Sequence, residues 1–164
     1  MRAFVDLNFE ICPQVTIAAW IQMSPDGANH WLVSSGNGQG PGIRVSDTAL
    51  VAEGTTNGIS EIGVVRDAAG FFFVASVWDY SSGAHTLYWR SRNASESMPV
   101  SGYLYPPEEA IWVGALNDGL SEPALGTLLD DLRIYSRALT ADEIRALQSG
   151  GAPEFEATAV PNGD

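Results

Sequence analysis

The feature that most constrains the fold is a series of short apolar runs broken at intervals by turn-forming clusters. The clusters are SPDG (24–27), GNGQGPG (36–42), TTNG (55–58) and SSGAH (81–85). Gly, Pro, Asn and Asp interrupt regular structure, and several short strands at this spacing are typical of an all-β sandwich. The chain has 164 residues, of which 45% are hydrophobic, so it can enclose one core, and no linker divides it.

The last predicted strand, LLDDLRIYS at 128–136, carries two adjacent aspartates. Side chains of a strand alternate between its two faces, so a half-buried strand is predicted here. One face then holds Leu128, Asp130, Leu132 and Ile134, and the other holds Leu129, Asp131, Arg133 and Tyr135. This alternation predicts that Asp130 lies on the apolar side of the strand, and that Asp131 forms a surface pair with Arg133.

One short helix is predicted directly after this strand, over residues 141–148. Thr140 and Glu143 have the spacing of a capping box, in which a hydroxyl and a carboxylate bond to each other's backbone N–H groups. Leu139 and Ile144 stand at the two positions of a hydrophobic staple. The helix is expected to end near Gly150.

The pattern Gly-x-hydrophobic-Asp-Asp-hydrophobic-Arg-Ile-Tyr, followed by Arg-Ala-Leu and the capped Glu-Ile helix, resembles the C-terminal signature of laminin-G-like domains in the concanavalin A-like jelly-roll superfamily. Upstream segments resemble that family's earlier strands, in the family's order: VTIAAWIQ (15–22), HWLVSSGN (30–37), GIRVS (42–46) and FFFVASVWDYSSGAHTLYW (71–89). The resemblance implies a two-sheet antiparallel β-sandwich. The residues predicted to be mainly buried between or against the sheets are Trp20, Leu32, Val74, Trp112, Leu132 and Ile134.

We therefore divide the chain into a laminin-G-like β-sandwich domain (1–149) and an acidic C-terminal tail (150–164). The tail has no periodicity and holds only two large apolar side chains, Phe155 and Val160. Two such side chains offset too little of the entropy lost on ordering the segment. We expect the tail to order by contacting another chain, through Phe155.

The charge balance limits the classes of partner. The chain has 20 acidic residues and 8 basic ones, all of them arginine, for a net charge of −12. Binding to nucleic acid or to an anionic membrane surface needs concentrated positive charge, so neither partner is expected. No apolar segment reaches the length that spans a bilayer, so membrane insertion is not expected either.

The single cysteine, Cys12, cannot form an internal disulfide, so the fold does not require an oxidising compartment. The N-terminal segment MRAFVDLNFE lacks the basic start and apolar run of a signal peptide. The resemblance, in contrast, implies a location outside cells. A phage virion protein released by lysis would reconcile the two, and we expect a virion or an extracellular surface.

No catalytic motif is recognised, and an enzyme is not predicted. The glycosidases of the superfamily carry a strand of the form Glu-x-Asp-x-(x)-Glu, which this sequence lacks. Neither His30 nor His85 accompanies a Gly-x-Ser-x-Gly nucleophile elbow, and each is interpreted as a structural or surface residue. One cysteine and two distant histidines do not make a zinc site.

A structural calcium ion is implied by the resemblance, although no cofactor is required. Relatives hold such an ion with an aspartate of the closing strand, which corresponds to Asp130, and Asp6 in the first predicted strand is the natural second ligand. Calcium prefers several oxygen ligands. The alternative is that Asp130 accepts hydrogen bonds from backbone or arginine donors without any metal.

Aromatic residues in turn-rich segments are the candidate contact surface. Tyr80, Tyr103 and Tyr105 lie in such segments, and Tyr103 and Tyr105 would point the same way in an extended chain. Sugar rings stack on aromatic planes, and aromatic side chains are also common at protein interfaces. The sequence does not decide between a glycan and a protein as the partner.

Two functions remain open after these exclusions. The first is a structural or decorating component of a larger surface assembly, such as a phage virion, which would contact other protein subunits through the tail and the aromatic loops. The alternative is a glycan-binding or adhesion module of an extracellular bacterial protein.

Overall fold

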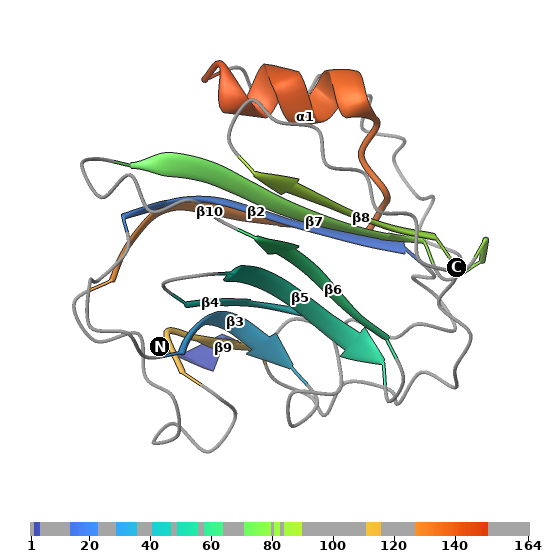
Figure 1. Cartoon of the computed structure of the whole chain (residues 1–164). Coiled ribbons are helices and arrows are strands. Elements are labelled where there is room, and N and C mark those ends of the chain that lie inside the picture. The colour runs from blue at the N-terminus through green and yellow to red at the C-terminus, as the bar shows by residue number, and fades with distance from the viewer. Residues whose placement is uncertain are drawn as a thin grey trace, which may run out of the picture.

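The computed structural model describes residues 2–3, 14–22, 29–35, 41–46, 49–55, 58–63, 71–79, 81–82, 84–89, 111–115 and 127–150. Within them, ten strands form two antiparallel sheets that face each other, and one short helix follows the last strand (Figure 1). The predicted two-sheet β-sandwich with one C-terminal helix is therefore confirmed.

The larger sheet has six strands in the order β1-β9-β3-β4-β5-β6. In that order the strands are Arg2–Ala3, Ile111–Val113, His30–Ser35, Gly42–Val45, Ala49–Thr55 and Gly58–Gly63. The smaller sheet has four strands in the order β10-β2-β7-β8. These are Leu128–Tyr135, Gln14–Gln22, Phe72–Asp79 and Ala84–Trp89.

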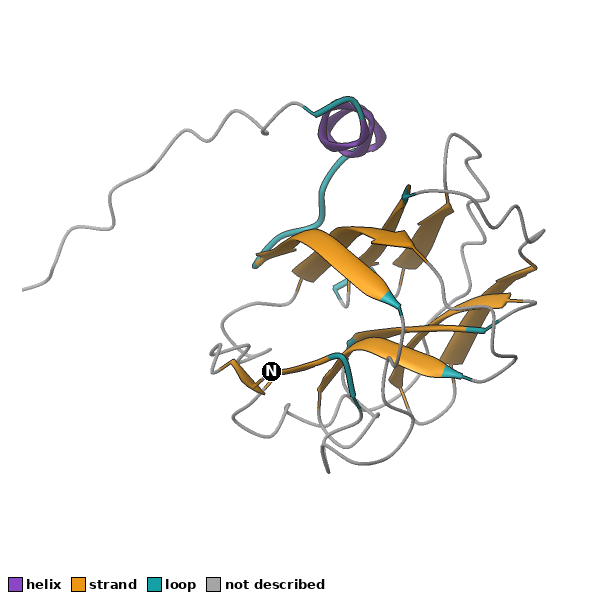
Figure 2. Ribbon diagram, turned by 90° about the vertical axis from the view of Figure 1, so that its left-hand side faces the viewer, coloured by secondary structure: helices purple, strands orange, loops and turns teal. Residues whose placement is uncertain are grey.

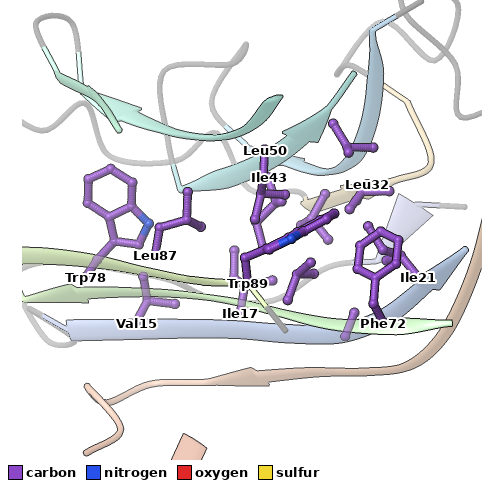
Figure 3. Close-up of a cluster of buried hydrophobic side chains, with 14 of the residues drawn as sticks. Val15, Ile17, Ile21, Leu32, Ile43, Leu50, Phe72, Trp78, Leu87 and Trp89 are labelled. Atoms are coloured by element: carbon purple, nitrogen blue, oxygen red, sulfur yellow. The ribbon is translucent and has the colours of Figure 1, made fainter. Parts of the chain in front are cut away.

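The main hydrophobic core lies between the two sheets. In the smaller sheet alternate residues point inward, so that Ile17, Ile21, Val74 and Leu87 share one interior face. Figure 3 shows Trp78 and Leu87 reaching from the smaller sheet toward Ile43 and Leu50 of the larger one. The buried members of this cluster are Val15, Ile17, Ala19, Ile21, Leu32, Val33, Ile43, Val45, Leu50, Phe72, Val74, Trp78, Leu87, Trp89 and Ile111.

The helix α1 (Ala141–Gln148) covers the outer face of the smaller sheet, as Figure 2 shows in a view along the helix. Its buried residues Ile144 and Leu147 pack with Leu139 on a second cluster of apolar residues. The strand residues of this cluster are Ala18, Phe73, Ala75, Val77 and Tyr135, with Trp20 and Tyr88 partly buried beside them. The helix range and the packing of Ile144 and Leu147 on the sandwich, which their spacing of three predicts, are confirmed.

The predicted capping box is also present. The Thr140 side chain accepts a hydrogen bond from the Glu143 N–H (3.3 Å), and Glu143 Oε2 accepts one from the Thr140 N–H (2.7 Å). Arg137 holds the same carboxylate through a 2.6 Å ion pair. The helix ends at Gln148, and Gly150, two residues further, has a φ of 86° and donates its N–H to the Leu147 carbonyl. Among the described residues, no helix is long and apolar enough to cross a membrane.

The closing strand β10 departs from the predicted alternation. Asp130 pairs with Trp20 and Arg133 pairs with Ala18, so three steps along β10 match two along β2. This is a β-bulge, and Asp131 adopts a φ of 48° within it. As a result Leu129 and Leu132 both face the core, whereas Asp130 is exposed on the outer face. The prediction that Asp130 lies on the apolar side was therefore wrong.

Four of the six residues predicted to be buried lie in or against the inter-sheet core. Leu32 and Val74 are fully buried in the core, and Leu132 and Ile134 are partly buried against it. Trp112 is half-buried on β9. Trp20 is also half-buried, but it lies on the outer face of the smaller sheet, with the cluster under the helix.

Candidate functional site

A buried polar cluster occupies the interior of the sandwich next to the hydrophobic core. His85 of β8 and Trp78 of β7 are cross-strand partners, and their rings stack with centroids 3.7 Å apart and planes 16° apart. The Nε2 atom of His85 lies 3.0 Å from the hydroxyl oxygen of Ser76. All three side chains are buried.

The environment of His85 keeps its imidazole uncharged. Burial penalises the charged form and lowers the pKa of His85 to about 3, from an ordinary value of 6.5. The side chain has no exposed surface. This serine–histidine pair therefore has no access to a substrate outside the protein, and His30 is likewise buried.

The outer face of the smaller sheet, in contrast, presents apolar side chains to solvent. Leu128 is 53% exposed and Phe71 is 46% exposed, and these are the exposed large hydrophobic residues of the described part of the chain. Leu128 pairs with Gln22 at the end of β2, and Ile21 pairs with Phe72. If the register continues by one residue, Phe71, which directly precedes β7, lies beside Gln22, so that Leu128, Gln22 and Phe71 form a line across the end of the sheet.

A second line lies directly behind the first on the same face. Asp130 pairs with Trp20, and Trp20 pairs with Phe73. The Trp20 and Phe73 rings meet edge to face, with centroids 5.6 Å apart. Phe73 is buried and Trp20 is half-buried, so this pair lies between the helix and the exposed residues Leu128 and Phe71. We call Leu128, Gln22, Phe71, Trp20 and Asp130 the end patch.

The charge at the end patch is negative. Asp131 binds Arg133 through a 2.8 Å ion pair, as predicted, so this arginine is already neutralised. Both side chains are substantially exposed, so the pair contributes little to stability. Asp130 Oδ1 accepts a hydrogen bond from the Asp131 N–H (2.9 Å), and no basic side chain among the described residues pairs with it. An acidic acceptor therefore borders the apolar line.

Comparison with protein families places this fold. The family model described as the concanavalin A-like lectin/glucanases superfamily matches residues 6–145. The chain belongs to that superfamily. No curated protein matches it at a significant level.

Solved structures share the fold at low sequence identity. A SAP-like heptameric pentraxin from Limulus polyphemus matches with a TM-score of 0.68 and 18% identity, over 87% of this chain and 72% of the pentraxin chain. The binding domain of botulinum neurotoxin DC in complex with SialylT matches with a TM-score of 0.66 and 14% identity, over 91% of this chain and 38% of the neurotoxin chain.

A second structure of the neurotoxin DC binding domain, in complex with rat synaptotagmin II, matches with a TM-score of 0.59 and 17% identity, over 85% of this chain and 36% of that one. This chain thus spans less than two fifths of these two neurotoxin binding domains. At these identities the likeness shows a common fold.

Five of the residues that the sequence predicts for a contact surface or a calcium site lie outside the part of the chain that the structure describes. These are Tyr80, Tyr103, Tyr105, Phe155 and Asp6. Their assignment to a contact surface or to calcium stays a prediction.

The bulge removes one reason to expect a calcium ion at Asp130. Its carboxylate is exposed rather than placed on the apolar face, so it does not need a cation to offset burial. The described residues contain no group of three or more His, Cys, Asp or Glu side chains that could hold a metal ion. Calcium binding stays a prediction, and a calcium-dependent rise in Tm that Asp130→Asn abolishes would support it.

Sequence reasoning missed Phe71 and Leu128 as surface residues, although one signal was available. Three phenylalanines, Phe71–Phe73, stand in a row, and a strand places successive side chains on opposite faces. At least one of the three must therefore face away from the inter-sheet core. Leu128 carried no such signal, because its orientation depends on the bulge.

Proposed function

We propose that this chain is a non-enzymatic binding module and that its ligand is a glycan. The observation that carries the proposal is the end patch, where exposed apolar side chains alternate with an amide and a carboxylate on one sheet face. Sugars present apolar C–H faces together with hydroxyl groups, so they complement such a surface. Binding sites typically combine apolar contact with a few placed polar groups.

Two further observations support a binding role over catalysis. Both histidines are buried, so neither is placed to act as a base on an external substrate. The structural neighbours include the binding domain of botulinum neurotoxin DC in complex with SialylT, and botulinum neurotoxin type C, whose cell entry depends on interaction with two ganglioside molecules. The proposal extends glycan binding in general, and not those particular ligands or their charge, to this chain.

The first function predicted from the sequence, a structural role in a surface assembly such as a phage virion, stays a prediction. It rests on the acidic tail and on the aromatic loops, which lie outside the described residues. A virion or extracellular location also stays a prediction. The decorating role predicts that deletion of residues 151–164 leaves the Tm of the isolated domain almost unchanged but abolishes incorporation into the particle.

Retention on immobilised polysaccharides tests the proposed function. We expect the purified chain to be retained on at least one of cellulose, β-1,3-glucan, chitin and galactan, and to release no reducing sugar from them. Absence of retention on any polysaccharide, or turnover that survives repurification and disappears in a carboxylate variant, would contradict the proposal.

A further inference from the structure

The end patch has a geometry that restricts the shape of its ligand. Leu128 and Phe71 stand on the two sides of Gln22, at one end of β10, β2 and β7. Neighbouring strands are about 4.8 Å apart, so the two apolar residues are separated by roughly 10 Å across the strands. This separation is about twice the length of one pyranose unit, so it suits two rings of an extended chain that have one ring between them, and not a single small molecule.

The helix leaves this end of the sheet open. Helix α1 packs on a cluster that contains Ala18, Ala75 and Val77 and that reaches Trp20 at its edge, so that of the end patch only Trp20 adjoins the helix cluster. In Figure 1 the end of the sheet at which β7 begins projects past the C-terminal end of α1. Leu128, Gln22 and Phe71 of the end patch thus lie beside the helix and not under it.

The charges on the face restrict the class of ligand. Arg133 is bound to Asp131, whereas the Asp130 carboxylate has an unused oxygen among the described contacts. The whole chain carries a net charge of −12. An anionic glycan would be repelled, whereas the hydroxyl groups of an uncharged sugar can donate to Asp130 and to the Gln22 carbonyl oxygen.

The exposed apolar area is too small for a stable protein interface. A large side chain contributes at most about 200 Å², and Phe71 and Leu128 are each about half exposed. Stable protein complexes bury about 800 Å² on each partner. Within the described residues, the end patch therefore matches a sugar chain better than a protein.

We propose that the end patch binds an uncharged, extended polysaccharide that crosses the strands, with one ring on Phe71, the next ring over Gln22 and the third ring on Leu128. Trp20 supports the ring on Phe71 from the side, and Gln22 and Asp130 bond to hydroxyl groups. This inference rests on the proposed function and adds to it the location of the site and the class of glycan.

The test compares three proteins on matched neutral and anionic polysaccharides. The probes are insoluble cellulose, β-1,3-glucan and chitin, with alginate and polygalacturonate as anionic counterparts. Phe71→Ser/Leu128→Ser removes both apolar contacts, and Arg145→Ala, on the exposed side of α1, is the control. We expect wild type and control to bind at least one neutral polysaccharide, and the double variant to lose at least tenfold in affinity.

A second variant distinguishes a loss of binding from a loss of folding. Gln22→Leu keeps the side-chain volume but removes the amide, and it is expected to weaken binding several-fold with an unchanged Tm. If the double variant and Gln22→Leu both bind as wild type does, the site lies elsewhere and only the location is wrong. Retention on the anionic polymers alone would overturn the choice of an uncharged ligand, and retention on none would overturn the glycan-binding function itself.

Discussion

The imidazole of His85 lies almost parallel to the indole of Trp78 in the interior of the sandwich, with 3.7 Å between the ring centroids. A hydrogen-bonding contact of 3.0 Å to Ser76 fixes the edge of the same ring. Because the ring has no contact with solvent, the fold accepts it only in the neutral form. A core histidine of this kind links the stability of the domain to pH.

We predict that the free energy of unfolding falls as the pH is lowered from 7 to 5. The pKa of His85 is lowered by burial to about 3 in the folded state, from 6.5. Between these values the unfolded chain binds a proton that the folded chain does not, so acid favours unfolding. The slope approaches about 1.4 kcal/mol per pH unit for one such group. Urea unfolding at pH 7 and pH 5 measures it.

The matched variant for this prediction is His85→Gln, which cannot titrate. It is expected to be less stable at pH 7 but to lose less stability between pH 7 and pH 5 than wild type. Glu143 does not confuse this window, because its hydrogen bond to Arg137 lowers its pKa to about 2, and its effect begins only below about 4.5. Equal slopes for the two proteins would show that His85 is not the sensor.

We predict that Thr140→Ala lowers stability by about 1 kcal/mol. The substitution removes the acceptor of the Glu143 N–H and leaves this backbone donor without its partner at the start of α1. Thermal and urea unfolding measure the change, with Ser136→Ala as the control at an exposed position outside the helix. A Thr140→Ala protein as stable as the control would contradict a contribution of the cap.

The cap and the bulge show what the sequence could and could not predict. A capping box is formed by residues within one turn, so Thr140 and Glu143 were recognisable from their spacing alone. The bulge depends on the pairing of β10 with β2, more than 100 residues earlier in the chain. Strict alternation put Asp130 on the wrong face for that reason. The end patch shares this origin, since Leu128 and Phe71 come together only through the sheet order.

We predict that Asp131→Ala is less stable than Asp131→Gly by about 1 kcal/mol. Both substitutions remove the ion pair to Arg133, so their difference reports on the backbone alone. At a φ of 48°, a Cβ atom is strained in the left-handed region, whereas glycine enters it freely. Urea unfolding of both variants measures the difference. A more stable alanine variant would show that the bulge relaxes without cost.

The last prediction concerns Gly42, where β4 passes close to β3. A Cβ atom at this position would lie 2.8 Å from Cζ3 of Trp31 and 2.8 Å from the Val33 carbonyl oxygen. The carbonyl belongs to the backbone of the sheet and cannot move aside easily. We therefore expect Gly42→Ala to lower the free energy of unfolding by about 1–3 kcal/mol.

A double-mutant cycle separates the two contacts of Gly42. Trp31→Phe shortens the ring that the new methyl group would meet, so the cost of Gly42→Ala should be smaller in the Trp31→Phe background. The remaining cost reports on the Val33 carbonyl oxygen. If Gly42→Ala costs the same in both backgrounds, the indole is not the obstacle. If it costs nothing in either, the close approach of β3 and β4 at Gly42 is contradicted.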